Sequence, residues 1–385
     1  MKQDTQIAFI RAALEQFDRN TADMGGEESL SPIERYLDPG RCAREMSTLF
    51  RRLPLAVCAA SRVARPGDCM THDLSGVPIL VVRGRDGVLR AFLNVCRHRG
   101  SRLVADGTAQ CPGAIVCPYH AWTYGHDGRL VGVPHEEGFP DLDRAEHGLV
   151  RLQVGEAFGL VFVVPDPAAP ACDLETWFGE VGADLSRFGL GDHVPYHPRR
   201  FERPINWKLM FDANLETYHV RFGHAKTIAS IFGDNKGVFE TFDFHARLFL
   251  PKRRIVELRD SEPGAWNVRW AGNVVYSLFP NTVILLELDH AMVMTIWPQG
   301  PEKSIVDSIA LIPEEPASEK ARGHWDRNMK VFWDALDEDY DLMESMQSTM
   351  RSGANRALRF GRFERCSAHF HEAVERAMAG AISSG

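Results

Sequence analysis

The sequence Cys96-Arg97-His98, followed by Cys117-Pro118-Tyr119-His120, decides how the N-terminal half of this 385-residue chain folds. Each stretch pairs one cysteine with one histidine, two residues apart in the first and three apart in the second, and eighteen residues (99–116) separate them. Two thiolates and two imidazoles fit a [2Fe–2S] cluster in which the cysteines hold one iron and the histidines the other. Neutral imidazoles make such a cluster less negative and raise its reduction potential. Cys96, His98, Cys117 and His120 are therefore the predicted cluster ligands, and the chain is expected to carry an electron.

The same four residues could instead hold a structural zinc ion. Zinc sites favour Cys-x-x-Cys and His-x(3–5)-His pairs, whereas each pair here mixes the two ligand types. Gly100 and Gly113 give the chain backbone freedom, and Pro118 makes the second loop rigid. This context favours the iron–sulfur cluster, and zinc remains the alternative.

The composition predicts a globular chain with room for two or three domains. Basic and acidic residues are well mixed at a formal net charge of −8, which argues against nucleic acid or an anionic membrane as a partner. No apolar run is long enough to span a membrane, and the N-terminus lacks a basic-then-apolar signal. The remaining cysteines are expected to be reduced thiols, which is typical of the cytoplasm. They are Cys42, Cys58, Cys69, Cys111, Cys172 and Cys366. We therefore expect a soluble, cytoplasmic protein.

Three segments are expected from the apolar patterns and the breaks between them. Residues 1–53 form an N-terminal helical segment, with helical spacing at 6–20 and 40–52. Residues 54–165 show short apolar runs between turn signals, which predicts a small all-β domain with the cluster loops at one end. A Pro- and Ala-rich linker leads to residues 173–385. There we expect consecutive antiparallel strands at 245–258, 266–279, 282–289, 291–298 and 304–312, and helices at 317–351 and 363–380.

A second group of chemistry-bearing residues lies in the stretch that runs from Asn206 to His224. His219 and His224 are five residues apart, so on an ideal helix they would point about 140° away from each other. The two imidazoles can converge on one metal ion only if the helix ends or bulges near Phe222-Gly223. A histidine pair at this spacing is by itself more often a surface or core feature.

Both groups together resemble the Rieske non-haem iron oxygenases. The stretches Cys-Arg-His-Arg-Gly and Cys-Pro-Tyr-His-Ala-Trp-Thr-Tyr are similar to the cluster loops of this family. The stretch from Asn206 is similar to its Asn-Trp-Lys…Glu/Asp-x-Tyr-His-x4-His signature. Ser101 and Tyr119 stand where respiratory Rieske proteins have an extra cysteine pair, so the resemblance is to the oxygenase branch and its large (alpha) subunits. It covers about residues 30–375.

The resemblance implies an α+β fold and a set of cofactors and partners. An N-terminal all-β Rieske domain would precede a helix-grip catalytic domain, in which helices cover an antiparallel sheet. The N-terminal helical segment would pack on the catalytic domain. The cofactors would be a Rieske [2Fe–2S] cluster and a mononuclear Fe(II). Because no dinucleotide-binding glycine fingerprint follows a strand, electrons from NAD(P)H would come through a separate flavin/iron–sulfur reductase, with or without a ferredoxin. The assembly would be a homotrimer that uses O2 and a small-molecule substrate.

The family also implies which residues hold the mononuclear iron. His219 and His224 need one carboxylate to complete a 2-His-1-carboxylate triad, which leaves coordination positions open. The acid-rich stretch 334–350 resembles the segment that donates this carboxylate, and its pattern selects Asp339. Asp337 and Asp341 remain alternatives.

Two further acids are predicted to act beside the iron ligands. Glu216 lies three residues before His219, on the same face of an assumed helix. In the family an acid at this position connects the two metal centres of neighbouring subunits, with His120 as its partner. Most members have Asp there, while some that act on small amines have Glu. Asp212 would fall on the same helical face and tune the site.

The substrate is the least determined feature of the sequence. Six aromatic residues are candidates for an aromatic pocket, which would suit an aromatic ring or a methylated ammonium group held by cation–π contact. They are Phe211, Phe222, Trp266, Trp270, Tyr276 and Phe279. The expected activity is hydroxylation or oxidative demethylation, as a mono- or dioxygenase, and Glu216 favours a small amine. The alternative is a Rieske electron-transfer protein without oxygenase activity.

Overall fold

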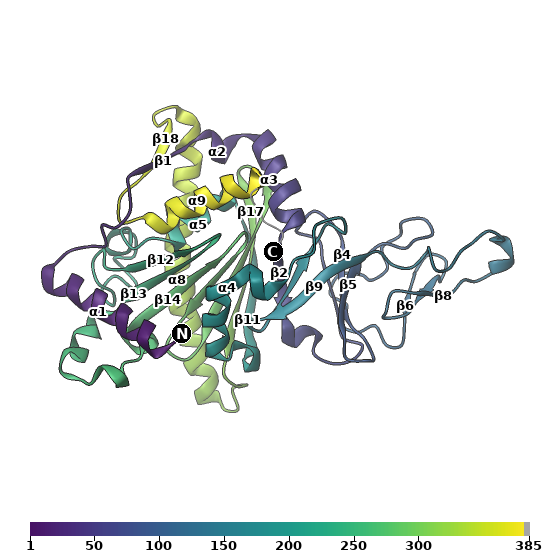
Figure 1. Ribbon diagram of the computed structural model, residues 1–385, viewed down its shortest axis with the longest axis horizontal. Coiled ribbons are helices and arrows are strands. Elements are labelled where there is room, and N and C mark those ends of the chain that lie inside the picture. The colour runs from purple at the N-terminus through teal and green to yellow at the C-terminus, as the bar shows by residue number, and fades with distance from the viewer. Residues whose placement is uncertain (381–385) are drawn as a thin grey trace. The chain divides into compact units, whose positions relative to one another are not determined.

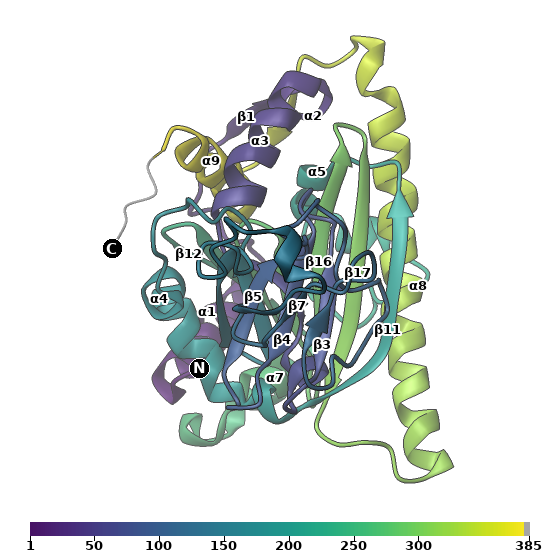
Figure 2. The ribbon, with the colours of Figure 1, turned by 90° about the vertical axis from the view of Figure 1, so that its right-hand side faces the viewer.

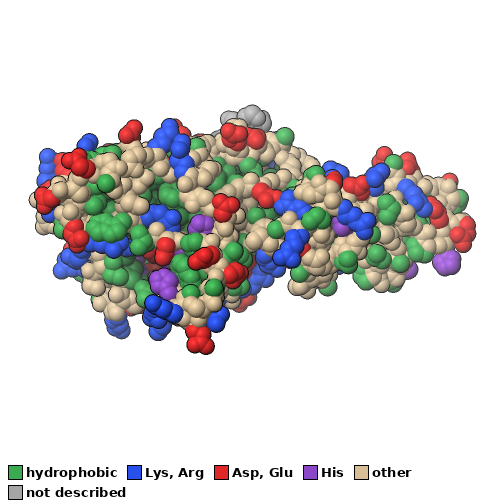
Figure 3. All heavy atoms as spheres, turned by 90° about the horizontal axis from the view of Figure 1, so that it is seen from below, with side chains coloured by type: hydrophobic (Ala, Val, Ile, Leu, Met, Phe, Trp, Pro, Cys, Tyr) green, Lys and Arg blue, Asp and Glu red, His purple; other side chains and the backbone are tan. Residues whose placement is uncertain are grey.

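The computed structural model describes residues 1–380 and divides into two compact units. Among the described residues, the smaller unit comprises Met46–Trp177, and the larger unit comprises Met1–Glu45 together with residues 178–380 (Figure 1). Basic and acidic side chains are interspersed on the face shown in Figure 3, as the mixed charges of the sequence predict. Within residues 1–380, no helix combines the length and the apolar character needed to cross a bilayer.

The smaller unit is built mainly from two antiparallel sheets. Its apolar runs are short and rich in Val, Ile and Leu, which suit a pleated surface; all five residues of Leu160–Val164, for example, are buried. The six-stranded sheet has the order β2-β10-β9-β5-β4-β3, and the three-stranded sheet has the order β6-β7-β8. The strands are β2 (Leu55–Ala59), β3 (Cys69–His72), β4 (Ile79–Arg83), β5 (Leu89–Leu93), β6 (Ile115–Val116), β7 (Thr123–Tyr124), β8 (Leu130–Gly132), β9 (Arg151–Ala157) and β10 (Leu160–Val164). The predicted all-β architecture is confirmed.

The loop after β5 contains the first pair of predicted cluster ligands and is fixed by a buried asparagine. The side chain of Asn94 donates a hydrogen bond to the Val104 carbonyl and accepts hydrogen bonds from the N–H groups of Leu103 and Val104. At the turn of this loop, Gly100 has a φ of +77°, a conformation that residues with a Cβ atom rarely adopt. The second ligand pair follows directly after β6, and its loop lies beside the first, since the His98 and His120 rings are in contact.

The centre of the larger unit is a seven-stranded antiparallel sheet with the order β11-β17-β16-β15-β14-β13-β12. Strands β13 to β17 are neighbours both in sequence and in the sheet, so they form the predicted meander (Figure 1). The strands are β11 (Val194–Arg203), β12 (Val238–Phe242), β13 (His245–Pro251), β14 (Gly272–Leu278), β15 (Thr282–Leu286), β16 (Ala291–Gly300) and β17 (Lys303–Ile312). A separate two-stranded sheet pairs β1 (Ser29–Pro32) with β18 (Ala357–Phe360).

Helices cover this sheet. The long helix α8 runs beside β11 (Figure 2), and its Trp325 and Met329 pack in one apolar cluster with Met292 and Ala310 of the sheet. The helices of the described chain are α1 (Gln3–Arg19), α2 (Glu34–Leu37), α3 (Pro39–Arg52), α4 (Leu174–Leu185), α5 (Trp207–Asn214), α6 (Val220–Gly223), α7 (Val268–Ala271), α8 (Glu319–Thr349) and α9 (Arg365–Met378). The four predicted helices correspond to α1, α3, α8 and α9. An antiparallel sheet covered by helices confirms the predicted α+β class.

Two parts of the predicted strands are helical instead. The strand expected at 245–258 ends at Pro251, and Arg253–Asp260 form a 3-10 helix in which only Ile255 is buried. The strand expected at 266–279 begins only at Gly272. Before it, the side chain of Asn267 accepts hydrogen bonds from two backbone N–H groups and so starts the short helix α7.

A buried ion pair joins α3 to α5. The Lys208 ammonium lies 2.8 and 2.7 Å from the two carboxylate oxygens of Glu45. Glu45 also accepts a hydrogen bond of 2.8 Å from the indole N–H of Trp207. Lys208 is 1% exposed and Glu45 is 0% exposed, so both charges depend on these partners. Trp207 is itself fully buried in the core.

Candidate metal centres

The four predicted cluster ligands lie in two adjacent loops of the smaller unit. The thiols of Cys96 and Cys117 are buried, whereas His98 is half-buried and His120 is exposed. The two imidazole rings have centroids 4.9 Å apart. The loops therefore present two thiols on their inner side and two imidazoles on their outer side. A cluster with two cysteines on one iron and two histidines on the other needs this separation of ligand types.

The surroundings of the thiols also fit metal ligands. Burial by itself would raise the pKa of Cys117, but hydrogen bonds from the backbone N–H groups of Tyr119 and His120 lower that pKa. These N–H groups favour the thiolate, which is the form that binds metal. The Tyr124 hydroxyl lies 3.3 Å from the sulfur of Cys96. The His98 ring is stacked on Trp122 at a centroid distance of 4.8 Å, which fixes the imidazole plane.

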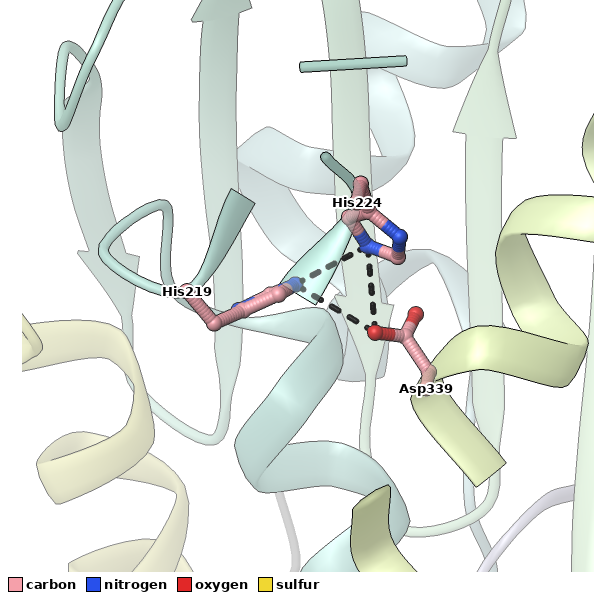
Figure 4. A group of neighbouring side chains, drawn as sticks. All are labelled: His219, His224 and Asp339. Atoms are coloured by element: carbon pink, nitrogen blue, oxygen red, sulfur yellow. Dashed lines mark hydrogen bonds and ion pairs between the residues drawn. The ribbon is translucent and has the colours of Figure 1, made fainter. Parts of the chain in front are cut away.

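In the larger unit, the side chains of His219, His224 and Asp339 point toward one another (Figure 4). The two imidazole Nε2 atoms are 3.2 Å apart, and the Asp339 Oδ1 atom lies 3.4 Å from His219 Nε2 and 3.1 Å from His224 Nε2. Three donor atoms at right angles around a metal ion, each with a bond of about 2.1 Å, are themselves about 3 Å apart. The three side chains therefore fit one face of an octahedral site.

The two histidines converge because the helix between them is very short. Helix α6 comprises only Val220–Gly223, so His219 lies just before it and His224 just after it. At Gly223 a Cβ atom would lie 3.3 Å from Cδ1 of Leu342 in α8, which is closer than most such contacts, and 3.4 Å from Cδ2 of His219. The sequence argument required the helix to end near Gly223, and the structure meets this condition.

Two carboxylates orient the imidazoles of this centre. Glu216 contacts Nδ1 of His219, and Glu338 accepts a hydrogen bond of 3.0 Å from Nδ1 of His224 and one of 2.6 Å from the Thr227 hydroxyl. With each Nδ1 occupied, both Nε2 atoms face the point where a metal ion would bind. Burial by itself would lower the pKa of His219, but Glu216 and Asp339 raise it to about 9. This excess of negative charge suits a divalent cation.

No pattern in the sequence identifies Glu338 or Thr227 as part of this site. Glu338 directly precedes Asp339 in α8, but helical geometry alone does not indicate that it reaches His224. The two alternative ligands lie elsewhere: Asp337 forms an ion pair of 2.7 Å with Arg203, and Asp341 is exposed.

The prediction that Glu216 and Asp212 share a helical face with His219 is wrong, because α5 ends at Asn214. Glu216 reaches His219 through a turn, in which its carboxylate also accepts the backbone N–H of His219 at 3.1 Å. Asp212 instead accepts a hydrogen bond of 2.8 Å from the Tyr36 hydroxyl and lies 2.8 Å from His371 Nε2. Asp212 therefore connects α5 with α2 and α9.

A cavity of about 660 Å³ opens onto the three converging side chains. Its wall is largely apolar, with residues from α8 and from strands β13 to β16. A second polar group comprises Lys252, Asn273 and Glu287, at the ends of three neighbouring strands. The Asn273 amide donates a hydrogen bond of 2.8 Å to Glu287, and Lys252 lies 3.6 Å from the same carboxylate.

The six aromatic residues proposed for the pocket do not line this cavity. Along β14, Asn273 and Val275 face the cavity, so the alternation of a strand turns Tyr276 to the opposite side. Phe211 is stacked on Phe370 in the core, and Phe222 is 68% exposed. The aromatic residues of the cavity wall are Phe232 and Phe332.

Two family models match the chain in these two units. The Rieske [2Fe-2S] domain matches residues 54–145, and the catalytic domain of the ring hydroxylating alpha subunit matches residues 190–380. The chain belongs to the Rieske non-haem iron oxygenases. This Rieske oxygenase is an alpha subunit with a [2Fe–2S] cluster and a non-haem iron as its cofactors.

Similar Rieske oxygenases act on amines and on aromatic compounds. The chain is 28% identical to the glycine betaine monooxygenase oxygenase subunit of Chromohalobacter salexigens, covering 87% of this chain and 83% of that protein. It is 27% identical to the carnitine monooxygenase oxygenase subunit of Escherichia coli K12, and the match covers 83% of this chain and 84% of that protein. It is 31% identical to the chlorobenzene dioxygenase alpha subunit of a Cupriavidus species, and the match covers 69% of this chain and 57% of that protein.

Solved structures show the same fold. A quaternary ammonium Rieske monooxygenase in complex with L-carnitine has a TM-score of 0.78 at 24% identity, with 92% of this chain and 97% of that chain covered. Naphthalene 1,2-dioxygenase from a Rhodococcus species has a TM-score of 0.74 at 20% identity, with 98% of this chain and 99% of that chain covered.

These findings confirm the predicted family, fold class and terminal oxygenase activity of this Rieske oxygenase. Alpha subunits of the family work with electron-transfer partners and form oligomers. Neither the zinc site nor the electron carrier without oxygenase activity gains support, because the matched models describe an iron–sulfur domain and a catalytic domain.

Proposed function

We propose that this Rieske oxygenase oxidises a methylated amine that also has an anionic group. In this proposal Cys96, His98, Cys117 and His120 hold the cluster. His219, His224 and Asp339 hold the mononuclear iron. When bound, the two groups supply electrons and activate O2 for transfer of oxygen to the substrate.

The chain's own residues have three tasks around these groups. Glu216 and Glu338 keep the Nε2 atoms of the two iron histidines turned toward the metal. The apolar wall of the cavity excludes water from the reacting carbon. Glu216 and His120 are the proposed link between the metal centres of adjacent subunits in a homotrimer, with electrons supplied by an NAD(P)H-dependent reductase. His120 is exposed on its loop and therefore accessible to a second subunit.

The charges of the cavity wall support the amine assignment. The wall contains Glu287, a carboxylate that contacts no iron ligand and favours a cationic group. The wall also contains the basic residues Lys252 and Arg253, which favour an anion. With Phe232 and Phe332 as its aromatic residues, the wall offers no complete aromatic cage, so carboxylates would have to recognise the cation. The glycine betaine and carnitine monooxygenases among its relatives add to this support.

Turnover with a panel of substrates tests the proposed function. The purified protein, with a reductase of the family, is expected to consume O2 and release formaldehyde or a hydroxylated product from a methylated amine with a carboxylate. Oxidation of benzene or naphthalene, with no reaction of any methylated amine, would show that the substrate is an aromatic ring.

A substitution of Lys252 tests the anionic group. Lys252→Met is expected to raise KM for trimethylated amino acids by about tenfold or more, because a charged hydrogen bond is lost. For choline, which lacks the carboxylate, KM should change little. Equal effects on both compounds would contradict a carboxylate at Lys252.

The role of Glu338, which contacts the iron ligand His224, is also testable. Glu338→Gln is expected to weaken Fe(II) binding by about 10- to 100-fold, because His224 loses the group that orients it. Fe(II) titration of metal-depleted protein measures this, with Asp341→Asn on the same helix as the control. If both variants bind iron as tightly as the unmodified protein, Glu338 does not support the site.

A further inference from the structure

Two cysteines that the cluster does not use lie side by side in the smaller unit. The Sγ atoms of Cys69 and Cys111 are 2.7 Å apart, and both residues are free thiols in the structure. Cys69 is 1% exposed and Cys111 is 6% exposed. Both belong to the apolar cluster that also contains the cluster cysteines Cys96 and Cys117. The sequence predicts a reduced thiol at each position and gives no sign that the two thiols lie together.

The backbone holds these thiols together. Cys69 is the first residue of β3, and its N–H group donates a hydrogen bond of 3.0 Å to the Ala109 carbonyl. The Cys111 N–H group donates one of 2.8 Å to the Gly67 carbonyl, on the other side of an antiparallel bridge between Asp68 and Gln110. In an antiparallel pair, residues 69 and 111 then point to the same face. The contact between the sulfur atoms is therefore a product of the fold.

We propose that Cys69 and Cys111 form a reversible disulfide that clips the segment between the two cluster loops onto β3. A disulfide bond is about 2.05 Å long, so a small rotation of the two side chains is enough to form it. The oxidant is a peroxide, a product expected when an oxygenase reduces O2 without oxidising its substrate. The two S–H bonds and the O–O bond break, the S–S bond forms, and the two thiol protons leave in two molecules of water.

The two sulfurs have different parts in this reaction. Cys111 is the more exposed of the two, at 6% against 1% for Cys69. Cys111 is also followed directly by the exposed Pro112. Cys111 is therefore the thiol that attacks the peroxide, and Cys69 is the thiol that resolves the resulting sulfenic acid.

The disulfide would stabilise the unit that holds the cluster. It would join β3 to the chain six residues before Cys117, and the closed loop would include Cys96 and His98. A cross-link over a loop of this size restricts the unfolded chain. The oxidised protein should therefore unfold at a temperature several degrees higher than the reduced protein.

Differential alkylation of the cluster-containing full chain tests this proposal. The protein is treated with one equivalent of hydrogen peroxide, while its visible absorption confirms that the cluster stays intact. Free thiols are blocked under denaturing conditions, disulfides are reduced, and newly freed thiols are labelled with a second reagent for peptide mass spectrometry. We expect the second label on Cys69 and Cys111 in equal amounts, and a linked peptide in the unreduced digest.

Variants separate this pair from other thiols. Cys111→Ser should remove the second label from Cys69 and remove the difference in unfolding temperature between treated and untreated protein. Cys172→Ser, at a half-buried thiol of the same unit, should change neither result. The proposal fails if Cys69 and Cys111 are alkylated as free thiols after peroxide treatment, or if Cys69 keeps its second label in Cys111→Ser. The first of these two outcomes is measured on the unmodified protein, so the test does not depend on the folding of a variant.

Discussion

Asp339→Ala is expected to abolish substrate oxidation and to leave the [2Fe–2S] cluster intact. Asp339 provides the oxygen atom that lies 3.4 and 3.1 Å from the two imidazole Nε2 atoms, and alanine leaves two neutral donors for a divalent ion. Loss of a direct ligand should weaken Fe(II) binding by more than the roughly 100-fold expected when a residue that only orients a ligand, such as Glu338, is replaced. The measured iron content should fall by one iron per chain, while the absorption and EPR signals of the reduced cluster remain.

Two matched variants in the same helix control for this result. Asp337→Ala removes an ion pair with Arg203, and Asp341→Ala removes an exposed charge. Both should keep the mononuclear iron. Loss of iron in Asp337→Ala with retention in Asp339→Ala would show that the assignment of the third ligand is wrong.

Glu45→Ala is expected to reduce the free energy of unfolding by about 3–5 kcal/mol, because it leaves the buried ammonium of Lys208 without its counter-charge. The same substitution removes the acceptor of the Trp207 indole. Equilibrium unfolding in guanidinium chloride, followed by far-UV circular dichroism, measures the change.

An exposed ion pair gives the comparison. Lys330 and Asp334 are also 2.7 Å apart, but their side chains are 72% and 47% exposed. Lys330→Ala should therefore cost less than about 1 kcal/mol. If the cost of Glu45→Ala is equally small, the buried pair does not hold α3 to α5.

The local parts of the two candidate centres could be predicted because their residues are close in sequence. The ligand pair of each cluster loop lies within a few neighbouring residues, and a glycine with a left-handed backbone marks the turn of the first loop. The convergence of His219 and His224 depended on one condition, a break near Gly223, which could be stated from the sequence. The family resemblance then gave the order of the domains.

Other features depend on pairs of residues far apart in the chain. Strand β11 has two prolines and mostly exposed or half-buried side chains, so it lacks an alternating pattern, and only its pairing with β17 makes it a strand. Tyr276 of the predicted pocket faces away from the cavity because the register of β14 turns Val275, and not Tyr276, toward it.

The sequence by itself determined the ligand types, their spacing and the order of the two domains, because these depend on short stretches of chain. Only the tertiary structure decided which acid of α8 faces the histidines. Asp337 and Asp341 are four residues apart and share one face of the helix, whereas Asp339 lies nearly opposite both. The docking of α8 on the sheet turns the Asp339 face toward α6 and brings Glu338 to His224. Packing over the whole larger unit sets that orientation, so the stretch 334–350 selected Asp339 only through the family resemblance and left Asp337 and Asp341 as alternatives.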